Sequence, residues 1–298
     1  MNPLQFPPKA AWRPLLEMAL AEDLGPGDVT SRIVISSDAR GHARIEARQT
    51  MVVCGLPLVA AVFHAVDESL ELHPQTEDGK TVPAGTTLLR ISGSTLSIMA
   101  GERLALNFLG RLGGVATYTR EYVDAVEGSG VEIIDTRKTL PGWRLLDKYA
   151  VLAGGGSNHR IGLFDGILLK DNHVAAAGGV ARAVTLARDN APKNLRIQCE
   201  VESLEDARHA FESGADMLLL DNQTPDQIRE IAAICPPHLV LEASGGITLK
   251  NVRDYASSGV HRISIGALTH SAPVVDVALE MDSAPDDAAP QSDTLHGE

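Results

Sequence analysis

Six short apolar runs in the second half of the chain constrain its fold more than any other feature. Each run is rich in Val, Ile and Leu and is followed by a segment with helical or loop character. Near-continuous apolar strands that alternate with helical segments are typical of a parallel sheet covered by helices. The runs are VEIIDT (131–136), GILLKD (166–171), LRIQCEV (195–201), MLLLDN (217–222), LVLEAS (239–244) and RISIGA (262–267).

Polar residues stand at the ends of most of these runs. Asp135, Lys170, Glu200, Asp221 and Ser244 each lie at or beside the carboxyl end of an expected strand. Parallel α/β barrels gather their chemistry at the carboxyl ends of their strands. We therefore expect an α/β barrel after Gly130, with a doubly wound sheet as the alternative.

The first part of the chain has a mixed pattern. Residues 42–55 and 86–94 predict strands, and residues 56–66 between them predict a short helix of small apolar residues. This combination suggests a compact α+β unit. A helical apolar pattern also covers residues 12–24.

A long amphipathic stretch connects the two parts. Ser94 and Thr95 offer an N-cap for it, and the pattern continues to Val126. Because Gly113 and Gly114 weaken its middle, we expect one or two helices joining two domains.

Composition excludes several classes of protein. The 298 residues carry a formal net charge of -13, which argues against nucleic-acid binding. Three widely spaced cysteines give neither a disulfide framework nor a metal-binding pair, which favours a reducing cytoplasm. Since no run approaches about 18 uninterrupted apolar residues, we expect no membrane span. Residues 284–298 are poor in large apolar side chains and are expected to be disordered.

One segment departs from the acidic balance of the chain. Residues 135–170 contain six Lys or Arg against three Asp. Guanidinium groups bind carboxylate and phosphate oxygens in a bidentate manner, and Lys adds a compact charge. The segment therefore predicts a site for an anionic ligand. Its cations are Arg137, Lys138, Arg144, Lys148, Arg160 and Lys170.

Carboxylates and glycine turns complete the candidate site. Glu200 and Asp221 are hard oxygen ligands that suit Mg²⁺ bound together with substrate phosphates. The turns at 243–246 (ASGG) and 264–267 (SIGA) let backbone N–H groups approach a phosphate. A phosphorylated, multiply anionic substrate with Mg²⁺ accounts for the cations, the carboxylates and the glycine turns together.

Each of these features has a simpler interpretation when it is taken alone. Arg144 and Lys148 fall in an expected helix, where they could be solvated or pair with Asp147. His159 could merely pack or cap a helix. Glu200 and Asp221 could be ordinary charges at strand ends, and glycine turns end many strands. Only the combination favours a catalytic site.

Several longer motifs together resemble the quinolinate phosphoribosyltransferase family. The resemblance extends over roughly residues 13–281, and its most specific part is the block from 135 to 174. The motifs are EDLGPGDVTS (22–31), GERLALNFLGRLGGVAT (101–117), DTRKTLPGWRLLDKYAVLAGGGSNHRIGLFDGILLKDNHV (135–174), LLLDN (218–222), LEASGGI (241–247) and IGALTHS (265–271).

The resemblance implies an α/β protein with two domains and a tail. The N-terminal domain is an α+β sandwich made of residues 1–115, to which residues 271–283 return. Residues 116–270 form an open, incomplete α/β barrel, and residues 284–298 form the tail. The resemblance also implies homodimers, some of them assembled further into hexamers, in which the first domain of one subunit closes the barrel mouth of the other.

The resemblance further implies a role for each candidate residue. Quinolinate's carboxylates are held by Arg137, His159, Arg160 and Lys170, with Arg103 reaching in from the partner. Lys138 lies beside the phosphoribosyl donor, and Glu200 and Asp221 bind its ribose hydroxyls and Mg²⁺. Thr136 is a further substrate-binding residue. The 5′-phosphate is cradled by Ser244, Gly245, Gly246 and Gly266.

The implied activity is phosphoribosyl transfer from 5-phosphoribosyl 1-pyrophosphate to quinolinate with decarboxylation, which gives nicotinate mononucleotide, pyrophosphate and CO₂ in NAD biosynthesis. A relative linked to molybdate transport and a non-catalytic anion-binding barrel are the alternatives. The choice between Glu200 and Glu202 is also open, because strand alternation places both on one face.

Overall fold

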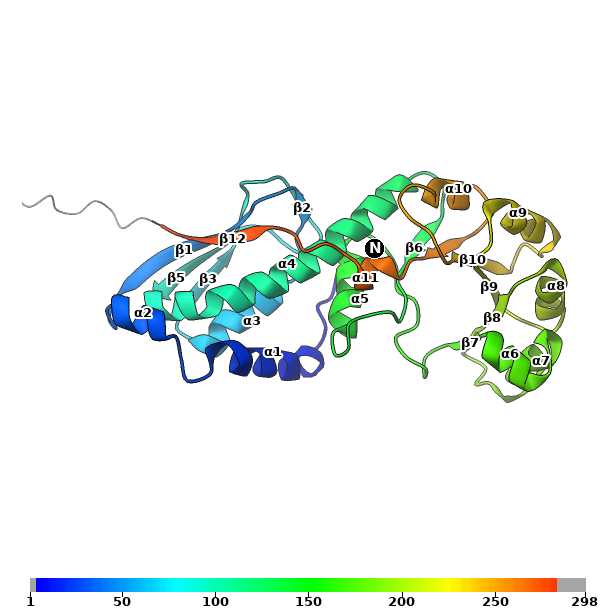
Figure 1. The fold of residues 1–298 in the computed structure, drawn as a ribbon, viewed down its shortest axis with the longest axis horizontal. Helices are drawn as coiled ribbons and strands as arrows, with labels where there is room; N and C mark the ends of the chain where they lie inside the picture. The colour runs from blue at the N-terminus through cyan, green and yellow to red at the C-terminus, as the bar shows by residue number, and fades with distance from the viewer. Residues whose placement is uncertain (1–3, 283–298) are drawn as a thin grey trace, which may run out of the picture.

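The computed structural model describes residues 4–282, and its second half contains the expected parallel sheet (Figure 1). All six predicted runs form strands, and every neighbouring pair is parallel. The order across the sheet is β6-β11-β10-β9-β8-β7. The strands are β6 (Glu132–Ile134), β7 (Ile167–Leu169), β8 (Ile197–Val201), β9 (Met217–Asp221), β10 (Val240–Ser244) and β11 (Arg262–Ser264).

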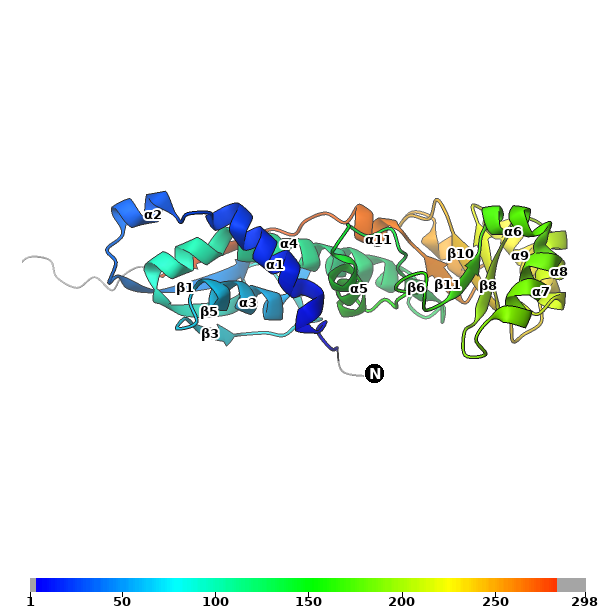
Figure 2. The same cartoon turned by 90° about the horizontal axis from the view of Figure 1, so that it is seen from below.

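This sheet is an open barrel, as predicted. A single parallel bridge from Ile134 to Ser157 extends it beyond β6. Within residues 4–282 no ladder joins β7 to β6, so the barrel does not close. Helices follow the strands, and most of them cover the outside of the sheet (Figures 1 and 2). They are α5 (Arg144–Ala153), α6 (Asp171–Ala177), α7 (Val180–Asn190), α8 (Leu204–Glu212), α9 (Pro225–Ile234), α10 (Val252–Ala256) and α11 (Ala267–His270).

Local sequence signals start the helices of the barrel directly after the strands. Ser203 accepts a hydrogen bond from the Asp206 amide at the start of α8. Thr224 and Gln227 form a reciprocal capping box at the start of α9. The connections from these strands to the helices are therefore short and anchored by hydrogen bonds. This fixes the positions of the residues that follow the strands.

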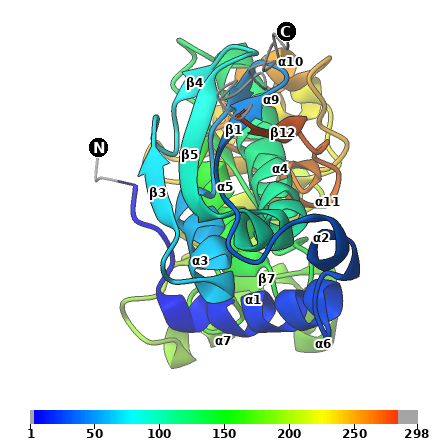
Figure 3. The ribbon, with the colours of Figure 1, turned by 90° about the vertical axis from the view of Figure 1, so that its left-hand side faces the viewer.

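An antiparallel sheet forms the core of the N-terminal unit, with the order β12-β1-β5-β3. Helices pack against it, and the predicted helix at 56–66 is observed as α3 (Figure 3). The predicted helix at 12–24 begins slightly earlier, at Lys9, and tolerates Pro14 in its first turns. The elements are α1 (Lys9–Leu24), α2 (Val29–Val34), β1 (Arg40–Ala47), β2 (Met51–Val52), α3 (Leu56–Val66), β3 (Glu71–Pro74), β4 (Thr81–Val82), β5 (Thr87–Ser94) and β12 (Val277–Met281).

One continuous helix, α4 (Thr95–Ala125), joins the two units (Figure 1). Ser94 caps it as predicted. Gly113 and Gly114 do not break it, and a Cβ at Gly114 would lie 2.0 Å from the Pro273 carbonyl oxygen. This glycine therefore serves the close approach of the returning chain. The boundary predicted after residue 115 falls inside the helix.

The chain returns along α4 to the N-terminal sheet. Strand β12 pairs with β1 in antiparallel register, from Ala43 opposite Met281 to Ala47 opposite Val277. The expected tail at 284–298 lies outside the described residues. In the described part of the chain, no helix is both long and apolar enough to cross a membrane.

Candidate active site

A cavity of about 570 Å³ opens at the carboxyl ends of the barrel strands. All but two of the predicted site residues line it, and the exceptions are Arg103 and Glu200. The predicted residues that line it are Thr136, Arg137, Lys138, His159, Arg160, Lys170, Asp221, Ser244, Gly245, Gly246 and Gly266.

Three cations that come from separate strand ends share this cavity. Partial burial and the neighbouring Arg137 charge lower the pKa of the Arg160 guanidinium. Arg160 is held in place because it donates to the Gly166 carbonyl at 2.9 Å. Lys170 lies 3.5 Å from a Glu200 carboxylate oxygen. Crowded like charges of this kind create an attractive potential for a multiply anionic ligand.

The expected carboxylate pair lies beside these cations. Burial raises the pKa of Glu200, Lys170 opposes the rise, and the Asp221 charge reinforces it. Glu200 is largely buried, whereas Glu202 lies beyond the end of β8 and is exposed. Among residues 4–282 no cluster of three or more His, Cys, Asp or Glu side chains could hold a metal by itself. The two carboxylates fit a Mg²⁺ ion that takes its remaining ligands from substrate oxygens and water.

Glycines shape the opposite wall of the cavity. Gly245 has a φ of +90°, and a Cβ there would lie 2.1 Å from Asn222 Oδ1. Asn222 itself has a φ of 54° and donates from its side chain to Asp221 at 2.9 Å. At Gly266 a Cβ would lie 2.9 Å from Lys138 Cδ. The glycine turns therefore let Asn222 and Lys138 approach the backbone closely.

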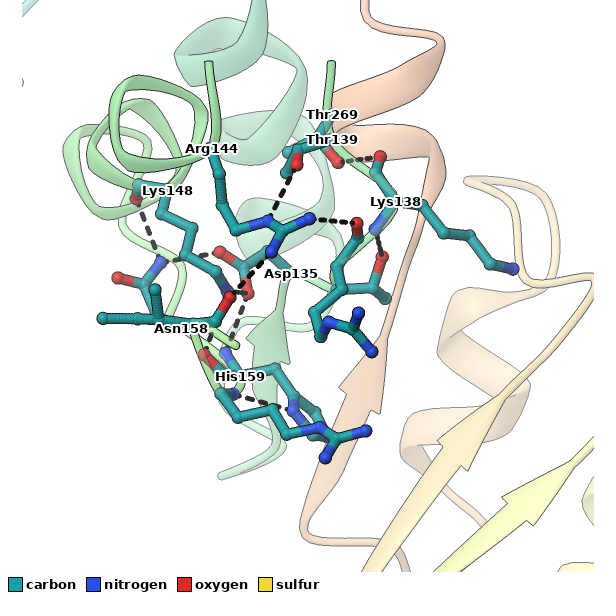
Figure 4. A network of polar contacts seen from close by, with 12 residues as sticks. Asp135, Lys138, Thr139, Arg144, Lys148, Asn158, His159 and Thr269 are labelled. Carbon is teal, nitrogen blue, oxygen red and sulfur yellow. Dashed lines mark hydrogen bonds and ion pairs between the residues drawn. The ribbon is translucent and has the colours of Figure 1, made fainter. Parts of the chain in front are cut away.

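A buried ion pair lies behind the loop that carries His159 (Figure 4). Lys148 Nζ lies 2.6 Å from Asp135 Oδ1 and also donates to the His159 carbonyl at 2.9 Å. The other contacts of Asp135 are with the His159 amide at 2.8 Å and with Asn158 Nδ2 at 2.8 Å. Burial raises the pKa of Asp135, and Lys148 opposes that rise.

These contacts correct two predictions. Lys148 is neither solvated nor paired with Asp147, because the fold packs α5 directly against the end of β6. Asp135, which was expected among the polar residues of the barrel mouth, is fully buried and supports the loop that carries His159.

The solvated interpretation of Arg144 is also wrong. Its guanidinium donates to Thr139 Oγ1 at 3.1 Å and to the Ile161 carbonyl at 3.1 Å, so it ties two loops together (Figure 4). Asp147 pairs instead with Arg111 on α4, at 3.0 Å. Arg111 also donates to the Thr269 carbonyl, and Thr269 Oγ1 donates to the Lys138 carbonyl at 2.8 Å.

Arg103 does not contribute to the cavity of its own chain. It projects from α4 with 65% of its side chain exposed. It lines a separate cavity of about 450 Å³ together with Asn107, Arg111 and Trp143.

One charged residue of the main cavity, Glu242, was not predicted from the sequence. It lies on β10 two residues before Ser244 and is only 1% exposed. Alternation along a strand places residues two apart on the same face, so the motif LEASGGI contained the signal. Glu242 lies 3.5 Å from His159 Nε2.

Comparison with protein families gives two adjoining matches. Residues 28–113 match the N-terminal domain of quinolinate phosphoribosyl transferase, and residues 115–280 match its C-terminal domain. Together the two matches cover most of the chain.

Individual relatives agree with these matches. The chain is 39% identical over 281 residues to a probable carboxylating nicotinate-nucleotide pyrophosphorylase of Bacillus subtilis, covering 94% of this chain and 95% of the relative. It is 38% identical over 288 residues to the chloroplastic carboxylating nicotinate-nucleotide pyrophosphorylase of Arabidopsis thaliana, covering 90% and 82%. The solved nicotinate-nucleotide pyrophosphorylase of Francisella tularensis superposes with a TM-score of 0.90 at 35% identity, covering 95% of this chain and all of that one.

Proposed function

Because the chain belongs to the quinolinate phosphoribosyl transferase family, we propose that it transfers a phosphoribosyl group from 5-phosphoribosyl 1-pyrophosphate to quinolinate. The products are nicotinate mononucleotide, pyrophosphate and CO₂, which places the reaction in NAD biosynthesis. The observation that carries the proposal is one cavity in which Arg137, Arg160 and Lys170 face Asp221 and the glycine turn after β10. A dicarboxylate and a phosphorylated sugar together match these groups.

In the proposed complex, the cations hold the two carboxylates of quinolinate. Arg137 and Arg160 supply forked donors, and Lys170 supplies a point charge. The 5′-phosphate is bound by Ser244 and by the backbone of Gly245, Gly246 and Gly266. Binding the two anions side by side overcomes the repulsion that keeps them apart in water, which brings the ring nitrogen to the anomeric carbon.

Glycosyl transfer then requires no covalent enzyme intermediate. The ring nitrogen bonds to the anomeric carbon while the bond to pyrophosphate breaks, and Lys138 offsets the growing charge on the leaving group. Glu200 and Asp221 would hold Mg²⁺, which supplies charge neutralisation for the phosphates when it is bound. Thr136 supports Lys138, because Thr136 Oγ1 accepts a hydrogen bond from the Lys138 amide at 3.0 Å.

Decarboxylation follows from the charge of the ribosylated ring. The 2-carboxylate leaves as CO₂, and the electron pair of the broken bond stays on the ring carbon, where the adjacent cationic nitrogen stabilises it. The carbon then takes a proton from solvent, and the 3-carboxylate stays bound to the cations. The protein's part in this step is to hold the ring in place and to limit the access of water.

The proposal includes a homodimer, with assembly to a hexamer as a further possibility, in which Arg103 completes the site of the neighbouring subunit. The exposed position of Arg103 on α4 supports it. Mixed dimers of Arg103→Ala and Lys170→Ala subunits should regain activity that neither variant has alone, since one of the two sites is then intact. Absence of recovery in verified mixed dimers would argue against a shared site.

A cytoplasmic location is part of the same proposal. The three free cysteines of the described chain, two of them buried, favour a reducing compartment.

The experiment that tests the function incubates the purified protein with quinolinate, 5-phosphoribosyl 1-pyrophosphate and Mg²⁺. Nicotinate mononucleotide and CO₂ should form in equal amounts, and nicotinate offered in place of quinolinate should give no product. Product from nicotinate alone, or none from either acid, would overturn the assignment and leave the molybdate-linked relative or a binding role.

A further inference from the structure

Glu242 is a buried carboxylate at the floor of a cavity built for anions. It lies two residues deeper along β10 than Ser244, and both line the same cavity. The register places it level with Leu219 on β9 and Arg262 on β11. Ligand-binding cations surround the cavity above it, and the function proposed for those cations does not use Glu242.

The two oxygens of Glu242 have different surroundings. Oε2 accepts a hydrogen bond from Gln198 Nε2 at 2.9 Å. Oε1 is buried and has no hydrogen-bond partner in the described part of the chain. A buried carboxylate with an unsatisfied oxygen is costly, and a glutamine here could keep the contact with Gln198 without burying a charge.

His159 faces this free oxygen. The Arg160 amide donates to His159 Nδ1 at 2.8 Å, so the ring proton of a neutral His159 lies on Nε2. Nε2 is 3.5 Å from Glu242 Oε1. Gln198 donates to Glu242 and His159 lies beside it, so what lies beneath the ligand is the buried negative charge of the Glu242 carboxylate.

The negative charge of Glu242 disfavours binding of the substrate and stabilises the positively charged species that forms from it. Quinolinate arrives as a dianion, which a carboxylate at the floor repels. Glycosyl transfer makes the anomeric carbon electron-poor and then makes the ring nitrogen cationic, and a fixed negative charge stabilises both. An interaction that is more favourable in the transition state than in the ground state raises kcat.

On the basis of the proposed function, we infer that Glu242 is a further specificity-determining residue of the reaction. It weakens binding of the dianionic acid and stabilises positive charge on the ring and the sugar. It also directs the carboxylates of the ligand upward to Arg137, Arg160 and Lys170, because no free donor awaits them at the floor.

The test is Glu242→Gln, which keeps the shape and the contact with Gln198 but removes the charge. We expect kcat to fall by about tenfold or more, while the KM for quinolinate decreases. Binding of benzene-1,2-dicarboxylate, which has both carboxylates but no ring nitrogen, should become tighter in calorimetry. Glu242→Asp keeps the charge and should retain more of kcat than the glutamine variant.

Two controls separate this role from a structural one. Glu230→Gln changes an exposed carboxylate on the outer helix α9 and should alter neither constant. A residue that only orients His159 would lower kcat when it is replaced but would not make dicarboxylate binding tighter, because orientation does not depend on negative charge at the floor of the cavity. Unchanged kcat and unchanged dicarboxylate affinity in Glu242→Gln would therefore refute the inference, as would weaker dicarboxylate binding.

The same experiment distinguishes failure of the inference from failure of the proposed function. Wild-type protein that makes no product from quinolinate refutes the function, whatever the variants do. Wild-type protein that makes product, together with a glutamine variant lacking the opposite changes in kcat and affinity, refutes only the role of Glu242.

Discussion

Replacing Lys148 with methionine tests the buried ion pair behind the active site. The side chains of Lys148 and Asp135 are 3% and 0% exposed, and their charged atoms are 2.6 Å apart. Methionine has a similar length and leaves Asp135 buried without its cation. Removing one partner of a buried pair costs about 3–5 kcal/mol, so the free energy of unfolding of Lys148→Met should fall by that amount.

The measurement is urea unfolding followed by tryptophan fluorescence. The chain has two tryptophans, and Trp143 immediately precedes α5, which carries Lys148. Lys80→Met is the matched control, because Lys80 forms an exposed ion pair with Glu77 at 3.3 Å. The control should lose at most about 1 kcal/mol. A loss of that small size in Lys148→Met would refute the reasoning.

The loss in Lys148→Met should also depend on pH. Burial raises the pKa of Asp135, and removing Lys148 removes the charge that opposes this rise. A carboxyl whose folded pKa is raised contributes stability below its unfolded pKa and loses it as pH rises through the folded pKa. The difference between wild type and variant should therefore shrink from about pH 8 to about pH 5. A difference in the free energy of unfolding that grows as the pH falls would show that the raised pKa of Asp135 is not the cause.

Two further predictions concern the supports of the site. Gly245→Ala should impair binding of 5-phosphoribosyl 1-pyrophosphate more than Gly246→Ala does, as measured by KM, because only the first Cβ meets Asn222, at 2.1 Å; equal effects would show that backbone strain alone matters. Arg111→Met should destabilise the fold by about 3 kcal/mol in urea unfolding, because it leaves the fully buried Asp147 without its cation. The control is Arg13→Met, which removes an exposed cation that lies 2.6 Å from Glu17. Similar losses of stability in both variants would contradict the prediction.

The strands of the barrel could be predicted because their signal is local. Each run is rich in apolar residues and most runs have a polar residue at or near the end, so strand type and strand end are both visible in a short window. All six runs form strands of one parallel sheet. The local pattern did not decide whether α4 is one helix or two. Gly114 is needed there because the backbone of Pro273, far along the chain, approaches it closely.

The partners of the charged side chains could not be predicted in the same way. Lys148 and Asp147 are neighbours on one helix, yet they pair with Asp135 and Arg111 on different elements. Those choices depend on how α5 packs between β6 and α4, which the local pattern does not specify. Glu242 was missed for a different reason, since its position between apolar residues of β10 resembles an ordinary strand interior.

The ion pairs also explain how an acidic chain keeps a cationic cavity. Each aspartate of the 135–170 segment is engaged away from the cavity: Asp135 with Lys148, Asp147 with Arg111, and Asp165 with the amides of Ile161 and Gly162.

The loop that carries Arg137 and Lys138 is anchored through its backbone. The Arg137 carbonyl accepts from Arg144, and the Lys138 carbonyl accepts from Thr269. Within residues 4–282 neither Arg137 nor Lys138 has an acidic side chain within ion-pair distance. Their backbone is thus held in place while their charged ends are not neutralised, so an incoming anion does not have to displace a protein carboxylate from them. Lys170, which contacts Glu200, is the exception, and binding there exchanges one carboxylate for another.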